Sequence, residues 1–170
     1  MPGTLPQEVF LFSDTVQNNI LFGSESTKDK EKVEKYATIT HVHNDILQLP
    51  KQYETIVGER GIMLSGGQKQ RISIARSLIK EPELVVLDDC LSAVDAKTEK
   101  IILDNLHQNL QNKTVIFITH RIFAAMSFDK IIVLNDGKIA EQGNHTTLIK
   151  KKGIYFDLYQ LQQTTETNEV

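Results

Sequence analysis

This 170-residue chain lacks the sequence features of disulfide-rich, membrane-spanning, secreted and nucleic-acid-binding proteins. Cys90 is the only cysteine, so no disulfide can form within the chain and we expect a reducing compartment. No apolar run is long enough to span a bilayer, and the first seven residues lack the charged and apolar regions of a signal peptide. Lysine and arginine are not clustered and the net charge is −3, which argues against nucleic acid as a partner.

The hydrophobic pattern changes about halfway along the chain. Before residue 80 the apolar residues recur at helical spacing, as in Val33, Tyr36 and Ala37. After it, two continuous apolar runs at 84–87 and 114–118 alternate with helical segments. That alternation builds a parallel sheet covered by helices. We therefore expect an α/β fold with buried strands, preceded by an α-helical subdomain.

Later residues predict a second kind of structure. Asn135-Asp136-Gly137 is typical of a hairpin turn between two strands, and two helices should follow it. The predicted division of the chain is a helical part at 1–79, an α/β core at 80–162 and a disordered tail at 163–170.

A glycine-rich run directly precedes a helix predicted at about 67–79. Two glycines let a backbone approach a ligand, a serine can cap the helix, and the helix N-terminus offers N–H groups and a positive dipole end. Such an arrangement suits an anion, phosphate above all. A plain turn that caps a helix would look the same, and the run by itself favours that interpretation until its companions are considered. The run consists of Leu64, Ser65, Gly66, Gly67 and Gln68.

Polar residues also follow both apolar runs. Because ligands bind at the carboxyl ends of parallel strands, Asp88 can hold Mg²⁺ through water, and Asp89 can orient or deprotonate an attacking water. His120 would lie beside Asp88 if the strands are neighbours, and could then contact a γ-phosphate. The alternatives are a polar pair that merely closes a strand and a structural histidine. Gln7 could reach a metal or water, although an isolated glutamine is a weak signal.

Taken in order, these residues resemble the exporter branch of the ATP-binding-cassette (ABC) ATPase family over about residues 5–162. The resemblance implies a partial phosphate-loop-ATPase sheet with a helical signature subdomain. The matching segments are 6–8 for the Q-loop with Gln7, 58–61 for the stretch that contacts transmembrane helices, 64–68 for the signature, 84–88 for Walker B, 91–95 for the D-loop with Asp95, His120 for the switch histidine and 142–148 for the C-terminal Gly-x-His-x-x-Leu stretch.

The family resemblance also implies a mechanism. Two such domains pair head to tail around ATP and Mg²⁺, and the signature of one closes on the γ-phosphate held by the phosphate loop of the other. Closure drives the coupled transmembrane helices to expose a substrate outward. The ATPase domains themselves lie at the cytoplasmic face of the membrane. Gln7, Asp89 and His120 would be catalytic, Asp88 and Gln7 would hold the metal, and residues 64–68 with Asp95 would contact nucleotide.

One departure from the family concerns the phosphate loop. No Gly-x-x-x-x-Gly-Lys-[Ser/Thr] occurs in the chain, so we expect the C-terminal part of a longer transporter or a truncated product that is soluble and cytoplasmic by itself. Its own nucleotide site should bind ATP poorly, and its sheet should have an exposed edge.

A second departure is Asp89, because active members carry glutamate there. This resembles the weakened half of heterodimeric multidrug-type exporters, whose signature completes the partner's site. We therefore expect a different, glutamate-bearing partner.

Three alternatives remain at this point. An importer ATPase is disfavoured by residues 58–61, and a DNA-repair cassette by the absence of a coiled-coil insertion between Gln7 and Leu64. From another class, the chain could be a dimerisation or docking module with no ATPase activity of its own. The transported substrate is not encoded in these residues.

Overall fold

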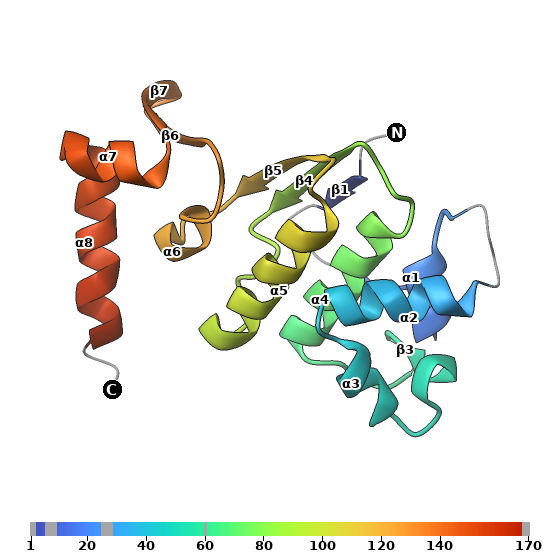
Figure 1. The fold of residues 1–170 in the computed structure, drawn as a ribbon. Helices are drawn as coiled ribbons and strands as arrows, with labels where there is room; N and C mark the ends of the chain where they lie inside the picture. Colours follow the sequence, from blue (N-terminus) through green and yellow to red (C-terminus); the bar gives the residue numbers. More distant parts are fainter. Residues whose placement is uncertain (1–2, 6–9, 25–28, 60, 168–170) are drawn as a thin grey trace. The chain divides into compact units, whose positions relative to one another are not determined.

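The computed structural model describes residues 3–5, 10–24, 29–59 and 61–167 (Figure 1). The chain forms two compact units, Met1–Ile118 and Thr119–Val170. The two units meet in the sequence between Ile118 and Thr119. The boundary that the sequence predicts between residues 79 and 80 separates subdomains, and it stays a prediction. Within the described residues, no helix combines the length and apolar character that a bilayer crossing needs.

A parallel sheet lies at the centre of the first unit. It consists of β1 (Gly3–Leu5), β4 (Leu84–Asp88) and β5 (Thr114–Ile118), in the order β1-β4-β5. Both neighbouring pairs are parallel, and Asp88 stands opposite Ile118 at the carboxyl end. The predicted α/β class with a partial parallel sheet is therefore confirmed.

The helical part of the same unit precedes β4. It contains β2 (Asp14–Thr15), α1 (Val16–Leu21), α2 (Lys30–Ile39), α3 (His43–Leu47), a 3₁₀ turn (Gln52–Glu54), β3 (Ile56–Val57) and α4 (Gly66–Leu78). β2 and β3 pair in antiparallel fashion. After β4, α5 (Ala96–Asn109) returns the chain to β5 (Figure 1).

One hydrophobic core joins the helices to the sheet. Ile72 and Leu78 of α4, Val85 and Leu87 of β4, and Ile102 of α5 are all at most 1% exposed and belong to the same buried cluster. Burying side chains of this size contributes about 1.5–3 kcal/mol each. The position of α4, and with it the glycine-rich run, is therefore fixed by packing.

β5 corrects one prediction from the sequence. The run 114–118 was expected to be buried on both faces, but Ile116 and Ile118 are 47% and 48% exposed. Val115 and Phe117 pack against the core instead. A continuous apolar run does not show which face a strand buries, because both faces carry apolar residues. α4 and α5 lie on one side of this sheet in Figure 1.

Arg76, near the end of α4, ties this helix to α1 and to the segment before it. Its guanidinium donates hydrogen bonds to the Asn19 carbonyl (2.7 Å), Asn19 Oδ1 (2.8 Å) and the Phe10 carbonyl (3.0 Å). It also lies 5.4 Å from the ring centroid of Phe12 and 5.8 Å from that of Phe22. Burial lowers the pKa of Arg76, although arginine stays charged in proteins.

Arg76→Met should reduce the free energy of unfolding of the chain by about 2–3 kcal/mol, because three acceptors lose a charged donor. Urea denaturation followed by circular dichroism measures the change. Lys100→Met, which removes an exposed charge from α5, is the matched control and should change stability by less than about 0.5 kcal/mol. A change of similar size in both variants would mean that the Arg76 contacts contribute nothing particular.

The second unit contains α6 (Ile122–Ala125), the antiparallel pair β6 (Ile131–Asn135) and β7 (Lys138–Gly143), α7 (His145–Lys151) and α8 (Ile154–Thr167). The predicted hairpin is confirmed, and its turn has φ of 49° at Asp136 and 71° at Gly137, as a type I′ turn requires. The disordered tail predicted from residue 163 is wrong as far as Thr167, because α8 continues there. Side-chain hydrogen bonds from Gln163 to Tyr159 and from Thr164 to the Gln160 carbonyl support that last turn.

Candidate nucleotide site

The glycine-rich run forms the start of α4, as the sequence predicted. Ser65 is the N-cap: the Gln68 N–H donates to Ser65 Oγ (3.1 Å), and the Ser65 N–H donates to Gln68 Oε1 (3.0 Å). This reciprocal pair is a capping box. Leu64 is buried, whereas Ser65 and Gly66 are exposed. The positive end of the helix dipole therefore lies at an accessible surface, where an anion can bind.

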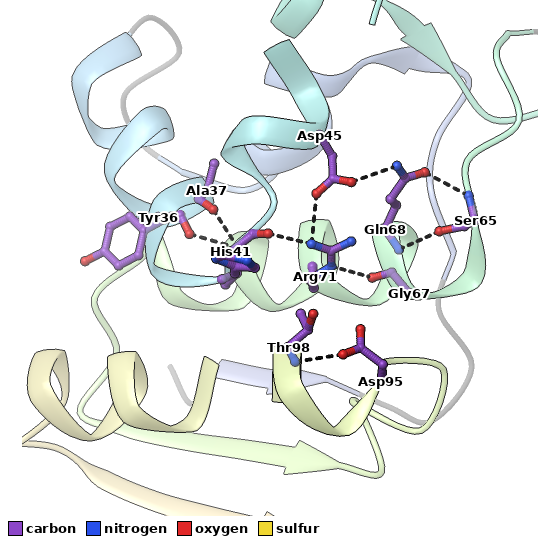
Figure 2. Close-up of polar contacts among 11 residues, drawn as sticks. Tyr36, Ala37, His41, Asp45, Ser65, Gly67, Gln68, Arg71, Asp95 and Thr98 are labelled. Carbon is purple, nitrogen blue, oxygen red and sulfur yellow. Dashed lines mark hydrogen bonds and ion pairs between the residues drawn. The ribbon is translucent and has the colours of Figure 1, made fainter. Parts of the chain in front are cut away.

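Gln68 and Arg71 bind the first turns of α4 to α3 and the preceding loop (Figure 2). Gln68 Nε2 donates to Asp45 Oδ1 (3.2 Å), and Arg71 Nη1 forms an ion pair with Asp45 Oδ2 (2.9 Å). Arg71 also donates to the carbonyls of His41 and Gly67. Asp45 and Arg71 were missed in the sequence, because nothing local indicates a contact across 26 residues.

The two glycines of the run face the loop at residues 91–95. A Cβ on Gly67 would lie 2.8 Å from the Ala93 carbonyl oxygen, and one on Gly66 would lie 3.2 Å from Ala93 Cβ. The sequence suggested that both glycines serve the approach of a ligand. The structure adds that Gly67 is needed for the close approach of the chain's own backbone.

The two aspartates lie at the carboxyl end of β4, as predicted. Asp88 ends the strand, and the Asp89 N–H donates to the Ile118 carbonyl (2.9 Å). Asp89 has φ of 43°, a left-handed conformation that aspartate tolerates better than most residues. Cys90 is fully buried beside them, and burial raises the pKa of its thiol to about 12, so it is not a reactive thiolate at neutral pH.

The two carboxylates offer Mg²⁺ oxygen ligands, which this ion prefers. No group of three metal-binding side chains occurs in the part of the chain that the structure describes. Mg²⁺ usually binds through one or two carboxylates together with waters and substrate phosphates, so a dedicated cage is not required. Asp88 and Asp89, half-buried at a strand end, fit that kind of site.

Asp95 is the N-cap of α5, with its carboxylate accepting a hydrogen bond from the Thr98 N–H (2.9 Å) (Figure 2). That hydrogen bond is the main cause that holds the pKa of Asp95 below its ordinary value. Because folding lowers this pKa, the ionised carboxylate stabilises the folded state. The contribution is complete at pH values above the unfolded-state pKa of about 3.9, and it is lost as the pH falls through the folded-state pKa.

Asp95→Ala should therefore lower the urea midpoint of the chain at pH 7, and the difference from wild type should shrink as the pH falls below about 4. Denaturation at pH 7 and pH 3 measures both effects. Asp104→Ala, at an exposed position of the same helix, is the control. A difference for Asp95→Ala that is as large at pH 3 as at pH 7 would exclude charge-dependent capping.

Two predicted site residues are not placed against this group. Gln7 lies outside the described residues. His120 belongs to the second unit, where its carbonyl accepts a hydrogen bond from Gln162 Nε2 (2.6 Å), and its predicted approach to Asp88 stays a prediction.

A groove of about 240 Å³ lies next to Leu64. Among the large apolar side chains along it, Met63 (77%) and Phe10 (60%) are the most exposed. Large apolar side chains exposed together around a hollow are typical of interaction surfaces. The lining residues are Phe10, Leu11, Gly58, Glu59, Ile62, Met63, Leu64 and Lys69.

Comparisons with known proteins agree on one family. The family model described as "ABC transporter" matches residues 2–92. The chain is 53% identical over 157 residues to the "Multidrug resistance-like ATP-binding protein MdlA" of Escherichia coli, covering 92% of this chain and 26% of that protein. It is 41% identical over 164 residues to the human "ATP-binding cassette sub-family B member 6", covering 96% of this chain and 19% of that protein.

A solved structure shows the same similarity in three dimensions. The structure of a bacterial Atm1-family ABC exporter with ATP bound superimposes with a TM-score of 0.89 at 38% identity. The match covers 95% of this chain and 28% of that one. The chain thus spans about a quarter of the length of the MdlA and Atm1-family proteins that it matches.

Proposed function

Because the chain belongs to the ABC transporter family, we propose that it works as part of an exporter's nucleotide-binding domain, coupling ATP binding and hydrolysis to transport. The similarity to a multidrug resistance-like ATP-binding protein and to an Atm1-family ABC exporter, over nearly the whole chain, supports this. The observation that carries the proposal is the capped glycine-rich start of α4, whose helix dipole meets an exposed surface suited to phosphate. This start includes residues 64–68, the signature run.

In this proposal the signature run serves ATP that is held by another domain. Ser65 and Gly66 of this run are exposed, and its geometry is held by the capping box and by Asp45, which leaves the helix N-terminus accessible to a phosphate on another domain. The head-to-tail pairing that this requires is the arrangement expected for the family.

In this proposal the remaining tasks are divided among Asp88, Asp89, Gln7 and His120. Asp88 would hold Mg²⁺ through water, together with Gln7, and the bound metal neutralises charge on the phosphates. Asp89 accepts a proton from, or orients, the attacking water, and His120 contacts the γ-phosphate. Since the aspartate carboxylate is one methylene short of a glutamate, Asp89 is the weak member of this group. This supports a heterodimer in which the partner carries glutamate.

The groove beside Met63 and Phe10 suits the transmembrane partner. It is lined by residues 58 and 59 of the stretch that resembles the transmembrane-contacting segment of exporters, and it exposes large apolar side chains. Docking there would place the chain at the cytoplasmic face of a membrane. No nucleic-acid partner is proposed.

Calorimetric titration with Mg-ATP tests the proposed function. The chain alone should bind no ATP at millimolar or lower concentrations. Added to a glutamate-bearing ABC ATPase domain with its own phosphate loop, it should increase the turnover of that domain. Clear binding by the chain alone would contradict the expected weakness of its own nucleotide site, and unchanged turnover in the mixture would favour the docking module without ATPase activity.

A further inference from the structure

Gln70, in the second turn of α4, is a buried polar residue that the site described above does not use. Its side chain is 6% exposed, and both ends of its amide form hydrogen bonds. Nε2 donates to Ser92 Oγ (2.9 Å), and Oε1 accepts from the Ala93 N–H (2.9 Å). Both partners lie in the loop that follows β4, so one side chain of α4 binds that loop twice.

These contacts lead directly to Asp89. Ser92 Oγ, which accepts from Gln70, itself donates to the Asp89 carbonyl (3.0 Å). Gln70 is therefore two hydrogen bonds away from the backbone of the weak catalytic residue. Asp89 has φ of 43°, a conformation that its surroundings must maintain.

A second contact from the same face of α4 acts on the same loop. Gly67 lies three residues before Gln70, which places both on one side of the helix. The backbone of Gly67 approaches Ala93 so closely that a Cβ would lie 2.8 Å from its carbonyl oxygen. Gly67 thus lets the loop pack against the helix, and the hydrogen bonds of Gln70 fix the position of the loop along the helix.

We propose that Gln70 is a positioning residue that holds the signature run and the Asp89–Ala93 loop in one fixed arrangement. The inference rests on the proposed function, because it matters only if both segments act on nucleotide. A domain of this kind uses its signature run on one nucleotide and Asp89 on another. Gln70 then links the geometry of the two sites through contacts within one chain.

The test uses Gln70→Met, which keeps an unbranched side chain of similar length but removes both hydrogen bonds. In hydrogen exchange on the full chain, the Ala93 amide should exchange at least tenfold faster, while the α4 amides keep their protection. In the mixture with a phosphate-loop ATPase domain, kcat should fall about tenfold with KM for ATP within twofold of wild type. Gln70→Glu retains an acceptor for the Ala93 N–H and should recover part of the protection and the turnover.

Gln108→Met, at an exposed position of α5, is the matched control and should change neither measurement. A turnover within twofold of wild type despite rapid exchange at Ala93 would overturn the proposal, as would loss of protection throughout α4. If the wild-type mixture shows no ATP turnover at all, the proposed function has failed. The exchange rate at Ala93 then still decides whether Gln70 holds the loop.

Discussion

Gly67→Ala is expected to lower ATP turnover by about 100-fold in a mixture of this chain with a phosphate-loop ATPase domain. The new Cβ would lie 2.8 Å from the Ala93 carbonyl oxygen, and a backbone atom cannot rotate away. Either α4 or the loop must shift, and displacement of a catalytic group by about 1 Å can cost about 10²-fold in rate.

The same substitution should destabilise the chain. Replacing glycine with alanine inside a helix normally stabilises it by about 1 kcal/mol, whereas overpacking costs about 1–3 kcal/mol. Because the clash is with backbone, we expect the cost to dominate at Gly67. Urea denaturation and steady-state ATP turnover, measured on the same preparations, check the two parts of this prediction.

Gly66→Ala is the matched comparison in the same helical turn. Its Cβ would meet only Ala93 Cβ, at 3.2 Å, so a shift of a few tenths of an ångström relieves the contact and stability should stay near wild type. If the two glycines served only the approach of a ligand, both variants would lose turnover without losing stability. That result would contradict a packing role for Gly67.

Asp89→Glu should raise ATP turnover at the site that contains this residue. A general base in hydrogen-bond reach contributes typically about 10²–10⁴-fold, and the added methylene brings the carboxylate toward the attacking water. The gain should fall at the lower end of that range, since glutamate tolerates φ of 43° less well than aspartate.

The measurement is single-turnover hydrolysis in the complete exporter paired with its partner, with Asp89→Asn as the control. Asparagine keeps the size and the backbone preference of aspartate but cannot accept a proton, so its turnover should be at or below wild type. Equal turnover in Asp89→Glu and wild type would show that Asp89 does not limit the reaction.

The sequence predicted those parts of the structure whose causes are local. Ser65 as N-cap follows from a serine before a helical pattern, and the turn at Asp136 and Gly137 follows from the conformations that these residues tolerate. Asp88 at a strand end follows from an apolar run that stops at a carboxylate. Each of these predictions depends on fewer than about ten neighbouring residues.

Contacts between distant segments could not be predicted in the same way. The ion pair of Arg71 with Asp45 joins residues 26 apart, and the hydrogen bonds of Gln70 reach across 22 and 23 residues. The half-exposed state of β5 depends on which face the helices cover, and apolar side chains on both faces hide that choice. The sequence therefore did not predict the hydrogen bonds and the ion pair that hold the signature run in place.

ATP-dependent cross-linking tests the central claim that the signature run acts on ATP held by another domain. Ser65→Cys in this chain would be combined with a cysteine in the phosphate loop of the partner domain, since the native Cys90 is buried and unreactive. With Mg-ATP and a mild oxidant, we predict a cross-link between the two chains that is weak or absent without nucleotide. A cross-link that forms equally well without ATP, or none in its presence, would contradict the claim.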